Sequence, residues 1–582
     1  MVLPDDVLEV RGPISNGDPY RSNNKDGNSN LKSIDLKNVR ILTGGALSDC
    51  VALESVTLPD SLITLGGGVF SGCARLRSIK GGRNVRQIGD GCFSGCAALT
   101  DFGELEKNVT HVGSWAFQNC GWFHDQPNGV VYFGKAAYAY KGSMAEGTVL
   151  SLRDGTVSVT YEFLAGQIEL NPTFDQPNLA GLILPQSCKY VDDYAFAGAK
   201  NMKFIDLGGV QYIGREAFNN SACESIVLPD SVESIGTSAF NRCSSLQEVV
   251  FGKGLASIGS MCFNYCHKLE RFVVDEANPN FKGMDGVLYN KNVDTLVLYP
   301  QGRPDASFTM PETVKHIGPY GIYEPQLLQA VTVSPILETI DEFGMAGIAL
   351  TGVVKLPATI TSIHFKAFQY DDGVTAFELP ESCAAYATVD GVLYDKDVTH
   401  LLVYPAGRPD VSYETPDTVR TVGSYAFHSC KYLENIRLTG VEKLEERAFS
   451  TAKALKHIDL ANSVQLIDTY ACANLSTLTY LTGTGALRAI GANAFSSTGL
   501  EFVTLPAIEL LGQYAFSFCK DMKRCIIGST VQSIYASAFN YCKGMHEAYF
   551  LGDRPDSVGA NIFAKTASDF TIYYDAAKAA TW

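Results

Sequence analysis

The sequence repeats one short motif along most of its length, and this repeat constrains the fold more than any other feature. The motif is Ile-Gly-x-x-Ala-Phe-x-x-Cys, with good copies at residues 112–120, 235–243 and 422–430. We take its Phe position as the anchor of each copy, and most successive anchors are 21 to 24 residues apart. A period of this length predicts a stacked array of small units. Nineteen positions fill the anchor: Leu47, Phe70, Phe93, Phe117, Phe163, Phe196, Phe218, Phe240, Phe263, Ile322, Met345, Phe368, Phe427, Phe449, Cys472, Phe495, Phe516, Phe539 and Phe563.

A second motif, Leu-x-x-Ile-x-Leu-Pro, follows each anchor, as at residues 53–59, 223–229 and 500–506. Its last positions alternate between apolar and variable residues, which is the period of a β-strand. Pro or Gly then ends the strand in a turn. A shorter apolar pair, such as the one at residues 234–235, predicts a second short strand. The Ala-Phe-x-x-Cys segment is long enough for only one or two turns of helix.

These elements predict a repeat solenoid that is mostly β, with short strands, short helical turns and a parallel sheet on its concave face. One unit cannot bury its apolar side alone, but stacked copies bury the side chains of their neighbours. No segment shows the sustained 3.6-residue period of a helical-repeat solenoid. The 582 residues therefore correspond to about 19 copies of one unit and not to several ordinary domains.

The longest gaps between anchors contain insertions. Residues 285–304 and 390–409 closely match each other, and each has two apolar runs around a polar turn, which predicts a β-hairpin. Residues 128–140 are a related variant. We expect hairpin insertions near residues 125–160, 275–310 and 381–416. Because anchors resume after each insertion, we expect one continuous array at residues 31–582. Residues 1–30 are expected to form a cap or a flexible segment.

Composition excludes several classes of protein. The 46 Lys and Arg residues against 62 Asp and Glu residues leave a net charge of −16 without a basic block, which disfavours binding to nucleic acid. No window approaches 18 apolar residues, so no helix is expected to insert into a membrane. The residues after Met1 lack the basic and apolar regions of a secretory signal, so we expect a cytosolic protein or a fragment without its export segment.

The combined pattern of anchor, Cys, strand and Pro resembles the BspA-type leucine-rich repeat, known from surface proteins of gut and oral anaerobes and some mucosal protists. The resemblance covers roughly residues 31–582, and the Asp-Gly-Val-Leu-Tyr hairpins look like inserts common in that family. Residues 8–14 and 31–41 are similar to the N-terminal cap region of the bacterial members. The resemblance implies a right-handed superhelix in an extracellular or cell-surface protein that binds other macromolecules, with adhesion to host matrix proteins as one associated role.

The cysteines and histidines offer few candidates for chemistry. Nine of the 16 Cys lie three residues after an anchor, where a buried column of free thiols explains them better than disulfides or zinc. The pairs Cys92/Cys96 and Cys262/Cys266 follow from the same repeat positions. The nine His are scattered, and no catalytic motif accompanies them. Residues 22–30 lack the end residues of a calcium loop, so a flexible loop is favoured. We therefore expect no catalytic residue, metal or cofactor.

The outward positions of the predicted sheet are the candidates for partner binding. In Leu-x-x-Ile-x-Leu, positions 4 and 6 point into the core, so positions 3 and 5 face outward. An apolar stripe there is a candidate binding patch, although cover by an inserted hairpin or the β-propensity of Val also accounts for it. A second patch mixes aromatic residues with Arg, as interface hot spots do. The stripe comprises Ile183, Phe204, Val227, Val250 and Val273, and the second patch comprises Tyr480, Phe502, Arg524, Ile526 and Tyr549.

The sequence is compatible with three functions. The first is a non-catalytic monomer that presents its concave sheet to a protein or glycan, such as host extracellular matrix or a mucosal surface. The second is a structural spacer or display stalk for another domain. The third and most remote is an enzyme, whose catalytic residues would come from distant positions of the sequence.

Overall fold

The computed structural model describes residues 1–2, 7–12, 30–161, 163–164 and 178–579. It is a mostly β parallel solenoid, which confirms the predicted fold class, and its turns, about 23, outnumber the 19 anchors found in the sequence. Internal contacts define an N-terminal unit (Met1–Lys291 with Pro300–Gly302) and a C-terminal unit (Asn292–Tyr299 with Arg303–Trp582), which we describe separately. Residues 13–29 lie outside the described residues. They make up most of the predicted cap and include nearly all of the loop that was compared with a calcium site.

Each turn of the N-terminal unit contributes one longer and one two-residue strand to separate parallel ladders. The longer strands are β2 (Ser33–Asp35), β4 (Ser55–Leu58) and β6 (Ser78–Gly81); β11 (Thr148–Ser151), β13 (Leu179–Ile183) and β15 (Phe204–Asp206); and β17 (Ser225–Leu228), β19 (Glu248–Phe251) and β21 (Arg271–Val274). The two-residue strands are β1 (Glu9–Val10), β3 (Ile41–Leu42), β5 (Thr64–Leu65), β7 (Gln87–Ile88) and β8 (His111–Val112), followed by β12 (Ser158–Val159), β14 (Tyr190–Val191), β16 (Tyr212–Ile213), β18 (Ser234–Ile235) and β20 (Ser257–Ile258).

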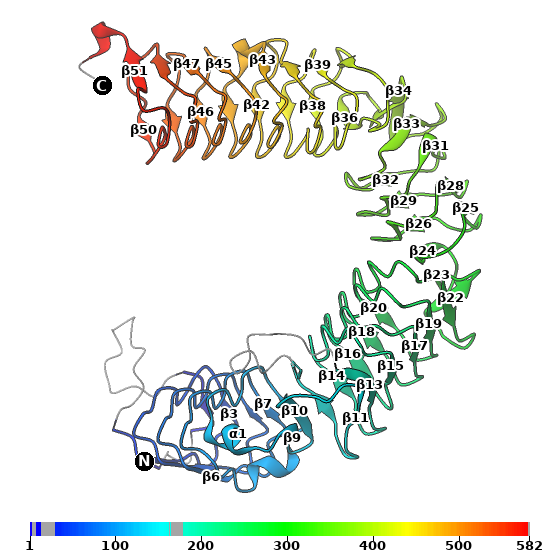
Figure 1. Ribbon diagram of the computed structural model, residues 1–582, viewed down its shortest axis with the longest axis vertical. Helices are drawn as coiled ribbons and strands as arrows, with labels where there is room; N and C mark the ends of the chain where they lie inside the picture. The colour runs from blue at the N-terminus through cyan, green and yellow to red at the C-terminus, as the bar shows by residue number, and fades with distance from the viewer. Residues whose placement is uncertain (3–6, 13–29, 162, 165–177, 580–582) are drawn as a thin grey trace. The chain divides into compact units, whose positions relative to one another are not determined.

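The C-terminal unit repeats this arrangement, and Figure 1 shows its longer strands along one side and its two-residue strands along the other. The longer strands are β25 (Ser307–Thr309) and β28 (Ala330–Thr332); β31 (Thr351–Lys355) and β33 (Gly373–Glu378); β37 (Ser412–Glu414), β39 (Asn435–Arg437), β41 (His457–Asp459) and β43 (Tyr480–Thr482); and β45 (Phe502–Leu505), β47 (Arg524–Ile527), β49 (Glu547–Phe550) and β51 (Thr571–Tyr574). The other ladders contain β24 (Thr295–Leu298), β26 (His316–Ile317), β29 (Thr339–Ile340) and β32 (Ser362–Ile363), then β36 (His400–Val403), β38 (Thr421–Val422), β40 (Lys443–Leu444), β42 (Leu466–Ile467), β44 (Ala489–Ile490), β46 (Leu510–Leu511), β48 (Ser533–Ile534) and β50 (Ser557–Val558).

Antiparallel hairpins lie within all three insertions. They are formed by β9 (Gly129–Phe133) with β10 (Ala136–Lys141), by β22 (Phe281–Met284) with β23 (Val287–Asn290), and by β34 (Tyr386–Val389) with β35 (Val392–Asp395). In the third insertion β35 also pairs antiparallel with β36, as the two apolar runs predict, and β34 adds a strand that the sequence analysis missed. The single continuous array stays a prediction.

The anchor segment is not helical, so the prediction of short helical turns at the anchors is wrong. Among the described residues the helices are α1 (Gly121–Asp125) and the short 3-10 segments η1 (Leu105–Asn108), η2 (Thr484–Ala486) and η3 (Ala576–Lys578). Around the anchor Phe240, Ser238 and Arg242 have φ values of 57° and 60°, which a right-handed helix does not allow. The amides of Ser238, Phe240 and Arg242 instead donate to carbonyls of the next turn, at 2.8–3.0 Å. The anchors therefore form a third parallel ladder, assigned as strands at β27 (Ile322–Tyr323) and β30 (Met345–Ala346).

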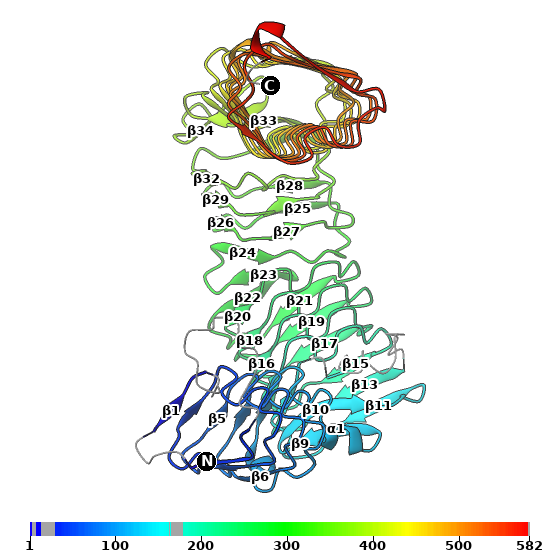
Figure 2. The same ribbon diagram turned by 90° about the vertical axis from the view of Figure 1, so that its left-hand side faces the viewer.

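The core of each unit is a stack of anchor side chains. Phe218, Phe240 and Phe263 lie ring over ring, with centroids 5.2 and 5.6 Å apart and planes within 7° of parallel. Eighteen of the 19 predicted anchors are buried, and Phe563 is half-buried near the end of the C-terminal unit. Figure 2 looks nearly along the yellow-to-red part of this unit and shows its successive turns lying one behind another. The apolar core thus runs along the stack.

All sixteen cysteines are free and buried, which confirms the predicted thiol column. The structure adds a reason for Cys three residues after the anchor. The Cys266 thiol donates to the Phe240 carbonyl at 3.2 Å, and Cys96 and Cys542 donate in the same way to Phe70 and Phe516. Each thiol thereby satisfies the anchor carbonyl of the preceding turn. A small apolar side chain with one weak donor fits this place.

Replacing Phe240 with Ala should destabilise the N-terminal unit by about 3–5 kcal/mol, because the ring is fully buried between two others. Since each turn contacts mainly its neighbours, hydrogen exchange should accelerate most in the adjacent turns. The control is Val227→Ala, an exposed position in β17, which should change stability by less than about 0.5 kcal/mol. Equal loss of protection along the whole chain would contradict local coupling.

The folded protein should react slowly with a thiol reagent such as DTNB, because all sixteen thiols are buried and burial raises the pKa of several of them, for Cys73 to about 12. In guanidinium chloride all sixteen should react within minutes. Rapid reaction of several thiols under native conditions, without unfolding by circular dichroism, would refute the buried column.

Candidate functional site

The apolar stripe of the N-terminal unit lies on the outward face of its longer strands. Four members are exposed, from 37% for Ile183 to 58% for Val227, whereas Val250 is half-buried. Val227, Val250 and Val273 are direct partners in the parallel sheet of β17, β19 and β21. Ile183 and Phe204 belong to the separate sheet of β11, β13 and β15, in which Ile183 pairs with Asp206. The structure therefore brings together three Val residues and leaves the stripe interrupted.

The C-terminal patch occupies the outward face of β43, β45, β47 and β49. Phe502 and Arg524 are exposed direct partners, and Ile526 and Tyr549 are half-buried partners in the neighbouring column. Tyr480 is 60% exposed but belongs to the adjoining sheet that ends at β43. The Arg524 guanidinium lies 5.3 Å from the Phe502 ring centroid, in cation–π range. Tyr573, which the sequence analysis missed, stacks on Tyr549 at 4.8 Å.

A shallow, open cleft of about 640 Å3 runs beside Phe502 and Arg524. Lys523 lines it, with its ammonium 5.5 Å from the Phe502 centroid and 2.7 Å from the Glu501 carboxylate. His546 also lines it and contacts Asp569 at 2.6 Å. An aromatic ring between two cationic groups at the edge of a cleft has the composition of an interface hot spot. The placement of these faces on a concave side stays a prediction.

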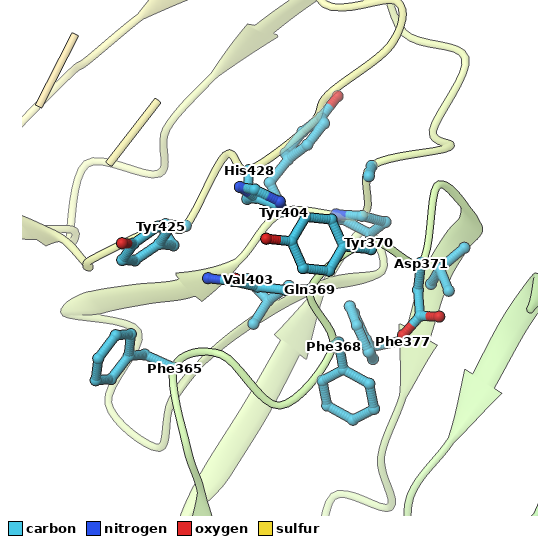
Figure 3. Close-up of a pocket in the computed structure, with 14 residues that line it drawn as sticks. Phe365, Phe368, Gln369, Tyr370, Asp371, Phe377, Val403, Tyr404, Tyr425 and His428 are labelled. Carbon is cyan, nitrogen blue, oxygen red and sulfur yellow. The ribbon is translucent and has the colours of Figure 1, made fainter. Parts of the chain in front are cut away.

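A second pocket lies in the C-terminal unit at the third insertion, and sequence reasoning did not find it. The segment after β32 together with β33, and the segments after β36 and β38, supply its walls. Figure 3 shows Phe365 and Tyr425 on one side and Asp371 beside Phe377 on the other. The space between the walls, open mouth included, is about 410 Å3, of which about 20 Å3 accommodates the centre of a water molecule.

The pocket contains buried polar atoms without hydrogen-bond partners among the described residues. They are the Gln369 amide nitrogen, the Tyr404 hydroxyl, His428 Nε2 and both Asp371 carboxyl oxygens. Such groups cost about 1–3 kcal/mol each when left unsatisfied and are rare in folded proteins. Burial lowers the pKa of His428 and raises that of Asp371 well above its ordinary value. Both groups are therefore shifted toward their neutral forms.

Asp371 occupies the place of the ladder cysteine, three residues after the anchor Phe368. It is only 2% exposed, yet it replaces a small thiol with a carboxyl group. This departure from the repeat can be found in the sequence by aligning the anchors. The pocket itself cannot, because its walls come from three segments brought together by the insertion.

Other residue types form no comparable centre in the part of the chain that the structure describes. No group of three or more His, Cys, Asp or Glu side chains is arranged to hold a metal ion. No helix among the described residues is long and apolar enough to cross a membrane. His457, for example, contacts Thr482 at 2.8 Å and lies beside Tyr480, with ring centroids 6.4 Å apart.

Comparison with protein-family models identifies the repeat. The model described as BspA type leucine rich repeat region, in six copies, matches residues 26–141, 170–284, 305–388, 411–523 and 486–575. The matched segments cover most of the sequence. The chain therefore belongs to the BspA-type leucine-rich repeat family, as the resemblance predicted.

Solved structures of three bacterial proteins are similar to this chain at 18% identity. A leucine-rich repeat protein from Eubacterium ventriosum matches 77% of this chain and 84% of its own length, with a TM-score of 0.32. A leucine rich cell surface protein from Faecalibacterium prausnitzii matches 77% and 92%, with a TM-score of 0.35. The pneumococcal vaccine antigen PcpA matches 77% and 98%, with a TM-score of 0.31. No curated protein matches the sequence.

Asp371 should make stability fall as the pH rises. Its pKa is higher in the folded protein than in the unfolded chain, so its favourable contribution is complete below the unfolded pKa and is lost as the pH passes the folded pKa. Asp371→Asn should remove this loss and leave the C-terminal unit more stable than the parent near neutral pH. Denaturant midpoints from pH 4 to 8 measure the effect, and parallel curves for the two proteins would contradict it.

Proposed function

We propose that this chain is a non-catalytic binding protein of the cell surface or the extracellular space. Membership of the BspA-type family supports the surface role, and the solenoid supports protein binding because stacked repeats present long, regular faces. The finer proposal is adhesion, with a protein or glycan of the host extracellular matrix or a mucosal surface as the ligand. The protein acts as a monomer in this proposal.

The observation that carries the proposal is the C-terminal patch. Phe502 is 43% exposed although it is large and apolar, and Arg524 and Lys523 flank it. Aromatic and Arg residues dominate the binding energy of protein interfaces, because they bury large areas and combine apolar and polar contacts. The adjacent cleft of about 640 Å3 offers a partner a recess beside these anchors. We therefore assign partner binding first to this patch and second to the Val227, Val250 and Val273 stripe.

A structural spacer or display stalk is the second candidate function. The observation that favours it is the regularity of the C-terminal ladders, in which β34, β35, β36 and the even-numbered strands from β38 to β50 form one ten-stranded sheet. Such a stack can hold another domain away from a surface without a ligand of its own. An enzyme remains the most remote candidate.

The test is binding of the purified chain to immobilised matrix proteins and mucins, measured by biolayer interferometry. The double variant Phe502→Ala/Arg524→Ala should weaken binding about 30-fold, as expected for the loss of about 2 kcal/mol at a hot spot. Phe204→Ala is the matched variant, because it removes an equally exposed ring at the same strand position in the N-terminal unit.

The outcomes separate the candidates. Loss of binding in the double variant alone supports the C-terminal patch, whereas loss in Phe204→Ala alone transfers the function to the N-terminal face around Phe204 and contradicts our assignment. A parent protein that binds none of the panel argues against adhesion and for a spacer.

A further inference from the structure

The pocket at the third insertion combines an aromatic mouth with a polar interior. Phe365 and Tyr425 lie with ring centroids 5.9 Å apart and planes inclined by 21°, and His428 meets Tyr370 and Tyr425 at 5.1 and 5.9 Å. Phe365 is 44% exposed and Tyr370 50% exposed, so part of each ring is available at the opening (Figure 3). The His364 ring and the Lys366 ammonium cover another part of Phe365, at 4.3 and 5.5 Å from its centroid. Exposed rings gathered around a recess are typical of small-molecule sites.

Unpartnered polar groups line the interior of this pocket. Gln369 is 5% exposed and Tyr404 2% exposed, yet the Gln369 amide nitrogen and the Tyr404 hydroxyl have no hydrogen-bond partner among the described residues. His428 Nε2 is likewise buried without a partner in that part of the chain. Native proteins satisfy such groups with protein, water or ligand. These atoms therefore leave hydrogen-bonding capacity inside the pocket, which water or a polar group of a ligand can use.

The charges near the pocket are already paired or suppressed. The Lys366 ammonium contacts the Glu342 carboxylate at 2.7 Å, and Lys431 contacts Asp372 at 3.4 Å. Burial disfavours the charged forms of Asp371 and His428. A charged ligand would therefore lose its hydration without gaining a partner of opposite charge.

We propose that this pocket binds one neutral sugar residue of a glycan. A hexose presents a flat face of C–H groups and a rim of hydroxyls, which match the aromatic mouth and the unpartnered polar atoms. The interior has room for about one water-sized group, so a single hydroxyl or hydroxymethyl group enters while the ring lies across Phe365 and Tyr370. This glycan site is separate from the Phe502 and Arg524 patch and independent of protein binding there.

Saturation-transfer NMR on the full chain tests the proposal with defined probes. These are the methyl glycosides of glucose, galactose, mannose and N-acetylglucosamine, with glucuronic acid as the charged comparison. At least one neutral glycoside should bind with a millimolar Kd, and glucuronic acid should not. Phe365→Ala should weaken the binding about tenfold, because it removes an exposed stacking ring.

Gln369→Met separates ligand recognition from a structural role. It keeps the length of the side chain and removes the unpartnered amide nitrogen, so the melting temperature should stay the same or rise while sugar binding is lost. Tyr535→Ala is the matched control, since this exposed ring follows β48 of the same unit and lies outside the pocket.

Three results would overturn the glycan site. They are no transfer to any neutral glycoside, equal binding of glucuronic acid, or parent-like sugar binding by both Phe365→Ala and Gln369→Met. In the first case the polar atoms hold an ordered water only. None of these results bears on capture of matrix proteins by the C-terminal patch.

Discussion

Hydrogen bonding between successive turns is the constraint on which the rest of the structure depends. Each turn donates and accepts at three places: the longer strand, the two-residue strand and the anchor segment, as Phe240 shows by donating to Cys262 at 3.0 Å. The three ladders fix the spacing between turns, and the anchor rings stack at 4.9–5.6 Å as a consequence. They also hold Ser238 and Arg242 in left-handed conformations that non-glycine residues avoid. The same hydrogen bonds between turns therefore satisfy the backbone amides and carbonyls, set the packing of the core and hold the left-handed residues in place.

The cysteine column follows from the same constraint. The anchor carbonyl points inward between turns, and the thiol three residues after the next anchor reaches it without adding bulk, as Cys266 does to Phe240. Asp371 is the exception that shows what the position requires. A carboxyl group there lies in the same buried column but has no partner for either oxygen among the described residues. Burial then drives it toward its protonated form, in which it can act as a donor like the thiol it replaces.

The sequence was sufficient to predict the solenoid, the buried anchors, the free thiols and the strand positions, because each depends on a local period. It predicted helix for the anchor segment wrongly, since no periodic signal distinguishes one helical turn from a chain whose residues at Ser238 and Arg242 turn left-handed. The outward placement of Phe502 and Arg524 followed from strand alternation. Their pairing across β45 and β47, the stack of Tyr549 on Tyr573 and the cleft beside them depend on register between turns, which one sequence does not contain.

The two candidate sites differ in origin, and this difference bears on what each can recognise. The Phe502 and Arg524 patch arises from the regular repeat, so its side chains project in columns at the spacing of the strands and suit a partner that extends over several turns. The pocket at Phe365 and Gln369 arises where the repeat is broken, because the inserted Tyr404 segment joins the Phe427 turn there, with the Tyr404 amide donating to the Ala426 carbonyl at 2.8 Å. A break of this kind gathers several enclosed polar atoms in one pocket, whereas the regular ladder has such atoms singly, as at Asn540. Extended recognition on the faces and small-ligand recognition at the insertions are therefore compatible in one chain, since neither uses the residues of the other.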